Sequence, residues 1–178
     1  MTNSHIFDEF EENEFPLAYL LTVRTYGTWL HGDQRTSFRR TRETKTQRKL
    51  IYPNVPLEEA MREEMDQEPF ILNTEQRKVV EAAIREVCIH REYKMFGVNV
   101  RSNHAHSVIG AQAKPERIAN TLKAYSTRRL RENGLIDQAT KVWSRGRSRR
   151  YLWKPRHVDA AIDYVLYCQS DIPFELDD

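Results

Sequence analysis

Apolar and polar residues alternate in two short runs between residues 96 and 109, and this pattern constrains the fold more than any other feature of the chain. In the first run the apolar positions are Phe96, Val98 and Val100, and Ser102-Asn103 then turns the chain into the second run. Side chains in a strand point alternately to the two faces of a sheet, so each run predicts a strand. Together the runs predict an antiparallel hairpin.

The second strand of this hairpin carries two histidines, His104 and His106, with Ala105 between them. Because alternate residues of a strand share a face, the two imidazoles point the same way. Two neutral imidazoles on one rigid strand can fill two positions of a divalent metal, and a third protein ligand, a water or a substrate oxygen can fill the rest. The pair is therefore half of a metal site, although a surface strand can also carry two histidines by chance.

Helical and strand-like spacing recurs on both sides of the hairpin. The elements that it predicts are a buried strand from Leu17 to Thr25, a helix from Thr74 to about Tyr93, a helix from Pro115 to Asn133, a hairpin or extended strand from Lys141 to Trp153, and a helix from about Arg156 to Cys168. The order along the chain is strand, helix, hairpin, helix, strand and helix. This order predicts an α+β fold in which helices cover an antiparallel sheet.

The length fits one domain, which we place at residues 16–170 between acidic tails at residues 1–15 and 171–178. The irregular stretch from Ser37 to Leu72 changes from basic to acidic and predicts an insertion with one short helix near Leu57 to Met65. The N-terminal tail has neither a basic start nor an apolar run, so we expect no signal or transit peptide, and no stretch predicts a membrane span. Two cysteines without zinc-finger spacing favour reduced thiols in a cytoplasmic protein.

Positive charge is concentrated between Lys114 and Arg156, where thirteen basic residues face three acidic ones. The segment carries +10 within a total of +2, so the rest of the chain carries −8. Arginine forks suit phosphates and aromatic faces stack on bases, which favours nucleic acid over a merely solvated surface, and single strands over duplex. The residues that we expect to bind DNA are Arg128, Arg129, Arg145, Arg147, Arg149, Arg150, Trp143 and Trp153.

The last predicted helix carries two tyrosines, Tyr164 and Tyr167, that lie off its apolar stripe. A tyrosine at the rim of a sheet that bears a metal can act as a nucleophile, with its phenolate attacking a phosphodiester. The ordinary roles of a tyrosine are packing or a hydrogen-bonded hydroxyl. Tyr125 is the rival nucleophile, but it shares a helix face with Leu122 and Ile118, which favours packing in the core.

The stretch Asn103-His104-Ala105-His106, followed by a basic helix and by a late helix with Tyr164-Val165, resembles the single-tyrosine HUH transposases of small bacterial insertion sequences, which include the REP-associated tyrosine transposases. The segments from Leu21 to Asp33 and from Trp143 to Trp153 resemble a signature of one branch of that group. The resemblance extends over about residues 19–169 without the stretch 37–72, and it rests on the order of the motifs as well as on their residues.

The resemblance implies an RRM-like/ferredoxin-like antiparallel sheet with His104 and His106 on a central strand. It implies cleavage of single-stranded DNA beside a folded hairpin, in which Tyr164 attacks the phosphorus, forms a 5′-phosphotyrosine and releases a 3′-hydroxyl. The phosphodiester energy is kept in this intermediate, so strand transfer needs no nucleotide cofactor. A Mg²⁺ or Mn²⁺ ion at the two histidines would polarise and orient the scissile phosphate.

The family places a third metal ligand, a glutamine or asparagine, four residues after the tyrosine, and this chain has Cys168 there. Gln169 is the right residue type one position late, about 140° from Tyr164 in a regular helix, so it reaches the metal only if the helix bulges or ends there. We assign Gln169 as the third ligand. Cys168 is the alternative, although a thiolate favours softer metals than phosphoryl transfer employs.

Two classes of function therefore remain: a metal-dependent single-strand endonuclease and strand transferase, and a non-catalytic nucleic-acid-binding module with the same sheet. Intact His104, His106 and Tyr164 favour the enzyme. The resemblance further implies a bacterial protein that works on the nucleoid, with hairpin DNA as its partner. It also allows a homodimer in which the tyrosine helix completes the site of its own chain or of the other.

Overall fold

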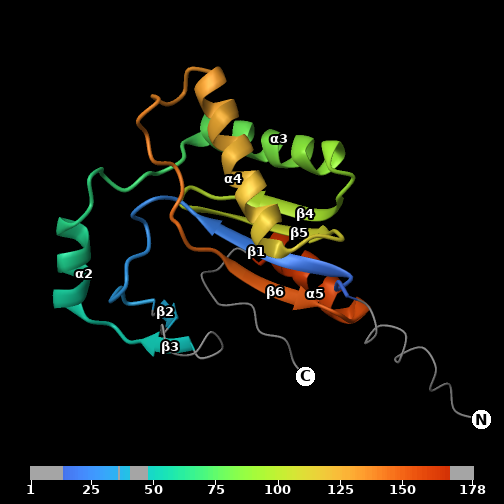
Figure 1. Cartoon of the computed structure of the whole chain (residues 1–178), viewed down its shortest axis with the longest axis horizontal. Helices are drawn as coiled ribbons and strands as arrows, with labels where there is room; N and C mark the ends of the chain where they lie inside the picture. Colours follow the sequence, from blue (N-terminus) through green and yellow to red (C-terminus); the bar gives the residue numbers. More distant parts are fainter. Residues whose placement is uncertain (1–13, 36, 41–47, 169–178) are drawn as a thin grey trace, which may run out of the picture.

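A four-stranded antiparallel sheet forms the centre of the fold in the computed structural model, which describes residues 14–35, 37–40 and 48–168 (Figure 1). The tails expected at residues 1–15 and 171–178 lie outside these residues, apart from positions 14 and 15. The elements in chain order are β1 (Ala18–Arg24), β2 (Ser37–Arg40), β3 (Arg48–Ile51), α2 (Val55–Glu63), α3 (Thr74–His90), β4 (Lys94–Val100), β5 (His104–Gly110), α4 (Pro115–Glu132), β6 (Ser148–Leu152) and α5 (Pro155–Leu166).

The strand order is β4-β5-β1-β6, so β5 with its two histidines is a central strand and β4 and β6 are the edges. Without the small β2–β3 sheet and α2, the order of elements is β1, α3, β4, β5, α4, β6 and α5. This is the α+β, ferredoxin-like arrangement with one added C-terminal helix. The predicted fold class and the central position of the histidine strand are both confirmed.

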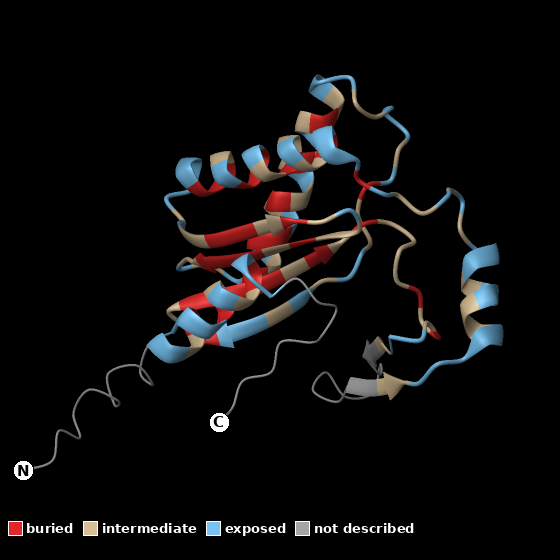
Figure 2. Ribbon diagram, turned by 180° about the vertical axis from the view of Figure 1, so that it is seen from behind, coloured by how far each residue is buried: buried red, intermediate tan, exposed pale blue. Residues whose placement is uncertain are grey.

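Helices α3 and α4 cover one face of the sheet (Figure 1). The odd-numbered residues of β1, including Tyr19 and Leu21, pack there with Ile84 of α3 and with Ile118 and Leu122 of α4. All five side chains are almost fully buried, and the red interior in Figure 2 runs between these helices and the sheet. This larger of the two apolar clusters holds the frame in place.

Helix α5 covers the opposite face and packs mainly on β4 and β5. Leu20 of β1, Val108 of β5 and Leu152 of β6 form the floor of this second cluster, and Val165 of α5 packs onto them. Because α5 has a single buried stripe, its other side chains are exposed or half-buried. Tyr164 is one of these half-buried residues.

The helices begin where the sequence predicts. Asn73 caps α3, with its side-chain oxygen accepting from the Gln76 amide while the Gln76 side chain accepts from the Asn73 amide. Pro115 and Pro155 stand in the first turns of α4 and α5, where a missing amide proton costs nothing. The observed α3 ends at His90, a few residues before the predicted Tyr93.

The segment expected as a hairpin or an extended strand is an extended strand along β1. Trp143 forms a bridge with Thr25, and β6 then pairs with β1 from Ser148 onwards. Between these two contacts, residues 145–147 loop out at the edge of the sheet. The hairpin alternative is therefore wrong.

The insertion predicted at about residues 37–72 contains the expected short helix as α2, which begins at Val55. It also contains the β2–β3 hairpin, which the sequence pattern did not predict. Gly32 has φ +95°, and a Cβ atom there would lie 2.5 Å from the carbonyl oxygen of Asn54, the residue that caps α2. A glycine is therefore required where the loop after β1 contacts this insertion. None of the helices among the described residues is long and apolar enough to cross a membrane.

Candidate active site

A row of polar residues crosses the sheet on the face that α5 covers, with one residue from each strand. His106 of β5 pairs with Asn99 of β4 and with Thr22 of β1, and Thr22 pairs with Ser148 of β6. Directly opposed residues of neighbouring strands point to the same face. Arg24 and His104 form the next pair on this face.

The imidazole rings of His104 and His106 lie with their centroids 4.4 Å apart. Asn103 Oδ1 lies 2.6 Å from His104 Nδ1, and Thr22 Oγ1 lies 2.8 Å from His106 Nδ1. An amide oxygen can only accept, so His104 Nδ1 carries a proton and Nε2 is the nitrogen suited to a metal. With the Thr22 hydroxyl as acceptor, His106 has the same tautomer.

Burial lowers the pKa of His106 to about 3, and the positive charges of His104, Arg24 and Arg101 act in the same direction. The sign follows from the chemistry of imidazole, because a low-polarity environment and nearby cations both disfavour the protonated ring. His106 is therefore neutral at physiological pH. Neutral imidazole is the form that binds a metal.

Tyr164 of α5 lies against these histidines. Its ring and the ring of His106 are edge to face, with centroids 5.5 Å apart. The Asn99 side-chain amide donates to the carbonyl oxygen of Val165 over 2.9 Å, which fixes this end of α5 to β4. Tyr164 and the two histidines thus come together in a single chain, from elements about 60 residues apart in sequence.

The other two tyrosines lie elsewhere. Tyr167 is 74% exposed at the end of α5. Tyr125 belongs to α4, on the opposite face of the sheet, where its ring packs against the larger core and under the guanidinium of Arg128. Of the three tyrosines weighed in the sequence, Tyr164 is the one in ring contact with a histidine of the pair.

The two candidates for a third metal ligand lie at and beyond the last described residue. Gln169 is outside the described residues, and the alternative, Cys168, is exposed. Helix α5 ends at Leu166, and the Cys168 amide donates to both Asp163 O and Tyr164 O. A helix end before residue 169 is the condition under which Gln169 could turn toward the metal. Its role as a ligand stays a prediction.

The donor set suits a divalent cation that takes further ligands from outside. His104 and His106 supply two ring nitrogens, and the Nδ1 atom of each ring has a hydrogen-bond partner. In the part of the chain that the structure describes, no group of three or more His, Cys, Asp or Glu side chains could hold a metal. A metal held by the two histidines would take its remaining ligands from other groups, such as the predicted Gln169, water or the oxygens of a bound phosphate.

Three residues of the site were missed as site residues in the sequence: Thr22, Arg24 and Asn99. The alternation of β1 places Thr22 and Arg24 on one face, but only the pairing of β1 with β5 brings that face to the histidines. Burial and the charge of Arg35 lower the pKa of Arg24 to about 10, against the opposing effects of Asp33 and Tyr164. Arg24 is therefore still protonated at neutral pH.

The two helical arginines of the predicted DNA-binding set have carboxylate partners. Arg129 pairs with Glu86 of α3 and with Glu132, and Arg128 pairs with Glu132 over 3.3 Å. These contacts include a link between α3 and α4 on the face away from the histidines. Arg129 has a structural role in this fold, and a role in DNA binding stays a prediction for both residues.

The four arginines around β6 divide between the two faces of the sheet. Arg149 pairs with Glu116 of α4 over 3.0 Å, and Arg147 Nη1 donates to Asn120 Oδ1 over 3.3 Å, so both lie on the α4 side. Arg150 pairs with Leu20 in the sheet and therefore lies on the α5 face, with the histidines. Arg145 is exposed in the loop at the sheet edge.

The two tryptophans of the set also differ in position. Trp143 Nε1 donates to Lys123 O over 3.1 Å, and its ring packs against the larger core. Trp153 is stacked on Tyr151, with ring centroids 6.4 Å apart and planes 9° apart. Tyr151 is 41% exposed on the edge strand. Of the two tryptophans, Trp153 is therefore the one that offers a surface for base stacking, together with Tyr151.

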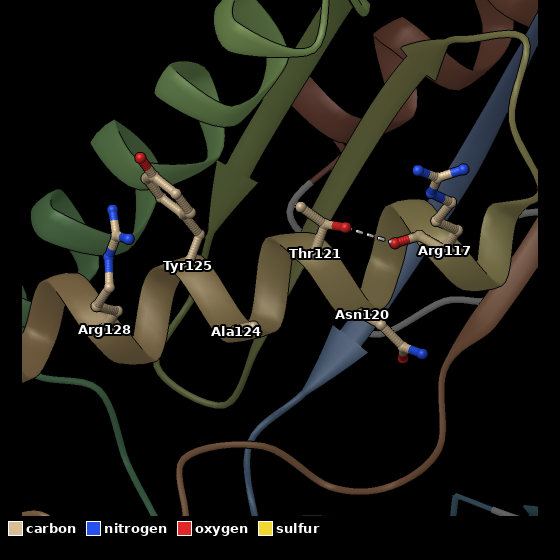
Figure 3. Close-up of a pocket in the computed structure, with 6 residues that line it drawn as sticks. All are labelled: Arg117, Asn120, Thr121, Ala124, Tyr125 and Arg128. Atoms are coloured by element: carbon tan, nitrogen blue, oxygen red, sulfur yellow. Dashed lines mark hydrogen bonds between the residues drawn. The ribbon is translucent and has the colours of Figure 1, made fainter.

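A shallow hollow of about 670 Å³ runs along α4. In Figure 3 the side chains of Arg117 and Arg128 stand at its two ends, and Tyr125 projects from the helix between them. This hollow lies on α4, on the opposite side of the sheet from α5, so it is separate from the histidines and Tyr164. Its cationic ends suit an anionic partner.

Comparison with known families identifies the class of protein. The family of IS200-like transposases matches residues 66–161, which is more than half of the 178 residues. The chain belongs to this family. The match includes His104, His106 and β6 and ends three residues before Tyr164. The contact of Tyr164 with His106 comes from the structure.

The solved structures similar to this chain include two transposases. One is a REP-associated tyrosine transposase bound to a REP hairpin, with a TM-score of 0.46 and 13% identity over 83% of this chain and 63% of that one, so the chain spans less than two thirds of that protein. The other is a candidate transposase from Deinococcus radiodurans R1, with a TM-score of 0.48 and 14% identity over 89% of this chain and 94% of that one. A search of curated proteins gives no match.

Proposed function

We propose that this protein is a metal-dependent single-strand DNA endonuclease and strand transferase that works through a 5′-phosphotyrosine at Tyr164. The observation that carries the proposal is the contact of Tyr164 with His106, at 5.5 Å between ring centroids, beside His104 on a central strand. A nucleophile next to a pair of metal-binding imidazoles is the arrangement that metal-assisted phosphoryl transfer needs. The family supports a DNA-processing enzyme.

In the proposed reaction the Tyr164 hydroxyl loses its proton and the phenolate oxygen bonds to the phosphorus of one phosphodiester. The bond from phosphorus to the 3′ oxygen breaks, and that oxygen takes up a proton. The products are a 5′-phosphotyrosine and a strand with a 3′-hydroxyl. Attack of a 3′-hydroxyl on the phosphotyrosine reverses the step and joins strands, so the exchange needs no nucleotide cofactor.

A Mg²⁺ or Mn²⁺ ion would be held by His104 and His106, with Gln169 as the proposed third ligand. When bound, such an ion neutralises and orients the non-bridging oxygens of the scissile phosphate. In this arrangement Asn103 and Thr22 accept from the Nδ1 atoms of His104 and His106, which leaves both Nε2 atoms for the metal, and Asn99 holds the end of α5 in place. The chain's own residues thus supply both the metal ligands and the nucleophile.

The DNA partner that we propose is a single strand beside a hairpin. Arg150 lies on the same face as the histidines, and Arg145 lies in the loop before this edge strand. The Tyr151–Trp153 pair lies at the same edge but on the α4 face, because Tyr151 pairs with Tyr19. A strand crossing this edge would meet phosphate-binding arginines and a stacking surface before it reaches Tyr164. A protein with this activity works on the nucleoid of a bacterial cell.

The test is a pool of 3′-labelled oligonucleotides that each contain a hairpin flanked on both sides by randomised single-stranded nucleotides, because the 3′ part of the strand is the part that stays on the tyrosine. The wild-type protein is incubated with this pool and Mn²⁺ and then analysed by denaturing electrophoresis. We expect labelled DNA that stays on the protein in detergent, and sequencing of that DNA gives the cleavage site. No adduct forms in EDTA.

His104→Ala and His106→Ala should abolish the adduct and leave single-strand binding nearly intact, because binding rests on phosphate and stacking contacts. His90→Ala, at the far end of α3, is the matched control and should keep the activity. Binding of DNA without an adduct in the wild-type protein contradicts the proposal and indicates a non-catalytic nucleic-acid-binding module. Unchanged cleavage in either histidine variant contradicts the metal site.

A further inference from the structure

Arg24 is a half-buried cation at the edge of the candidate site. It ends β1 opposite His104, two residues after Thr22, so it lies on the face that carries the histidines and Tyr164. It pairs directly with His104, whose ring lies 4.4 Å from that of His106, and the His106 ring contacts Tyr164. Arg24 is therefore close to the metal-binding imidazoles and to the nucleophile.

The loop after β1 holds the Arg24 guanidinium in one place. Its Cζ atom lies 3.2 Å from the centroid of the Trp29 ring, and the guanidinium of Arg35 lies near the same ring at 4.6 Å. Arg35 is neutralised by Asp33, with Nη2 2.6 Å from Oδ2, and its Nη2 also donates to the Thr28 carbonyl. Stacking on an indole leaves the in-plane N–H groups of a guanidinium directed outward.

The negative charge of Asp33 acts on Arg24, but the two side chains do not form an ion pair. No aspartate or glutamate among the described residues forms an ion pair with it, because the one carboxylate of this loop, Asp33, is paired with Arg35. Burying a cation without a partner is costly, and a phosphate is an anion that matches the planar fork of a guanidinium. The arrangement is thus prepared for an anion brought by the substrate.

We propose that Arg24, stacked on Trp29, binds the phosphodiester that lies between the histidines and Tyr164. This assignment rests on the proposed function, since it identifies a further residue for the same site. Arg24 donates N–H groups to the non-bridging oxygens of that phosphate and holds it in position for attack. The negative charge that builds up on the phosphorus oxygens during attack is stabilised by the same cation.

The first experiment uses one phosphate and no cleavage. The protein is titrated with the dinucleotide TpT and, separately, with its neutral methylphosphonate analogue, in Mg²⁺, while the side-chain N–H resonances of Arg24 are followed by NMR. We expect the Arg24 resonance to shift with TpT and not with the analogue, and the exposed Arg91 to serve as the control that does not shift. An unmoved Arg24 resonance, or equal shifts with both ligands, overturns the assignment.

The second experiment measures the coupling between Arg24 and individual phosphates. The protein carries Tyr164→Phe, so it cannot react. Its affinity is measured for the oligonucleotide identified from the adduct, and then for versions of this oligonucleotide in which one phosphate at a time is replaced by methylphosphonate. Replacement of the phosphate at the cleavage site should lower the DNA affinity of the parent about 10- to 100-fold. The same replacement should lower the DNA affinity of the Arg24→Gln variant much less, because this variant already lacks the contact. Arg24→Lys should keep part of the coupling, and Arg91→Gln should keep all of it.

Additive losses at every phosphate mean that Arg24 contacts none of them, and they overturn the assignment even if Arg24→Gln binds weakly. The experiments distinguish failure of the Arg24 assignment from failure of the proposed function. Adduct formation by the wild-type protein together with an unmoved Arg24 resonance leaves the proposed function and removes the role of Arg24. If the Arg24 resonance shifts with TpT and not with the neutral analogue, but no adduct forms, Arg24 binds a phosphate and the proposed transferase activity is contradicted.

Discussion

Thr22→Val tests how the metal-binding imidazole is oriented. Valine has the shape of threonine, so the substitution removes the hydroxyl that lies 2.8 Å from His106 Nδ1 and little else. One hydrogen bond contributes about 0.5–1.5 kcal/mol to folding, so the change in unfolding free energy should stay within that range. Loss of the group that orients a metal-binding histidine lowers metal affinity by about 10- to 100-fold. The loss of metal-binding free energy should therefore exceed the loss of unfolding free energy.

The assay is the titration of bound Mn²⁺ by electron paramagnetic resonance, in the Tyr164→Phe background with a saturating hairpin oligonucleotide. Urea unfolding of the same variants gives the stability. Thr127→Val is the matched control, because the Thr127 hydroxyl donates to Lys123 O within α4, on the other side of the sheet. Equal Mn²⁺ affinity in Thr22→Val and its parent would refute the reasoning that Thr22 orients His106.

Three further predictions follow from the packing and the charges. Leu152→Ala should lower the unfolding free energy by about 2–5 kcal/mol in urea titrations, because Leu152 is fully buried under α5, whereas Leu166→Ala, at 37% exposure, should cost clearly less. Arg145→Ala and Arg150→Ala should each reduce the slope of log affinity against log salt concentration for single-strand binding by up to about 0.7. Arg129→Ala loses the contacts with Glu86 and Glu132, so it should lower the unfolding free energy and leave this slope unchanged. Mn²⁺ should bind the protein–DNA complex more tightly than the free protein, because His104 and His106 need added oxygen ligands. Equal Mn²⁺ affinities by calorimetry with and without DNA would contradict this.

Local patterns in the sequence predicted the elements that form the frame. The alternation around His104 and His106 placed both on one strand face, and the capping box at Asn73 marked the start of α3. Helical spacing separated Tyr164 from the buried stripe of α5, and the structure places it half-buried at the rim. Each of these features depends on residues close together in the chain, where periodicity is informative.

Contacts between distant segments could not be read in this way. The opposition of Thr22 to His106 spans 84 residues and depends on the register between β1 and β5. Pairing of Arg129 with Glu86, and of Arg149 with Glu116, likewise depends on how α4 lies against α3 and β6. Sequence alone showed a dense basic segment, and the fold shows which of its arginines are paired with acids.

Mass spectrometry of the trapped protein–DNA adduct tests the central claim most directly. After digestion with protease and nuclease, the account predicts a nucleotide linked through a 5′-phosphate to Tyr164, and no adduct from Tyr164→Phe under conditions in which Tyr167→Phe and Tyr125→Phe both react. Because Tyr164→Phe removes one oxygen from a half-buried ring, it should bind the same DNA with similar affinity. A nucleotide on Tyr167, or cleavage that persists in all three variants, would contradict the assignment of Tyr164 as the nucleophile.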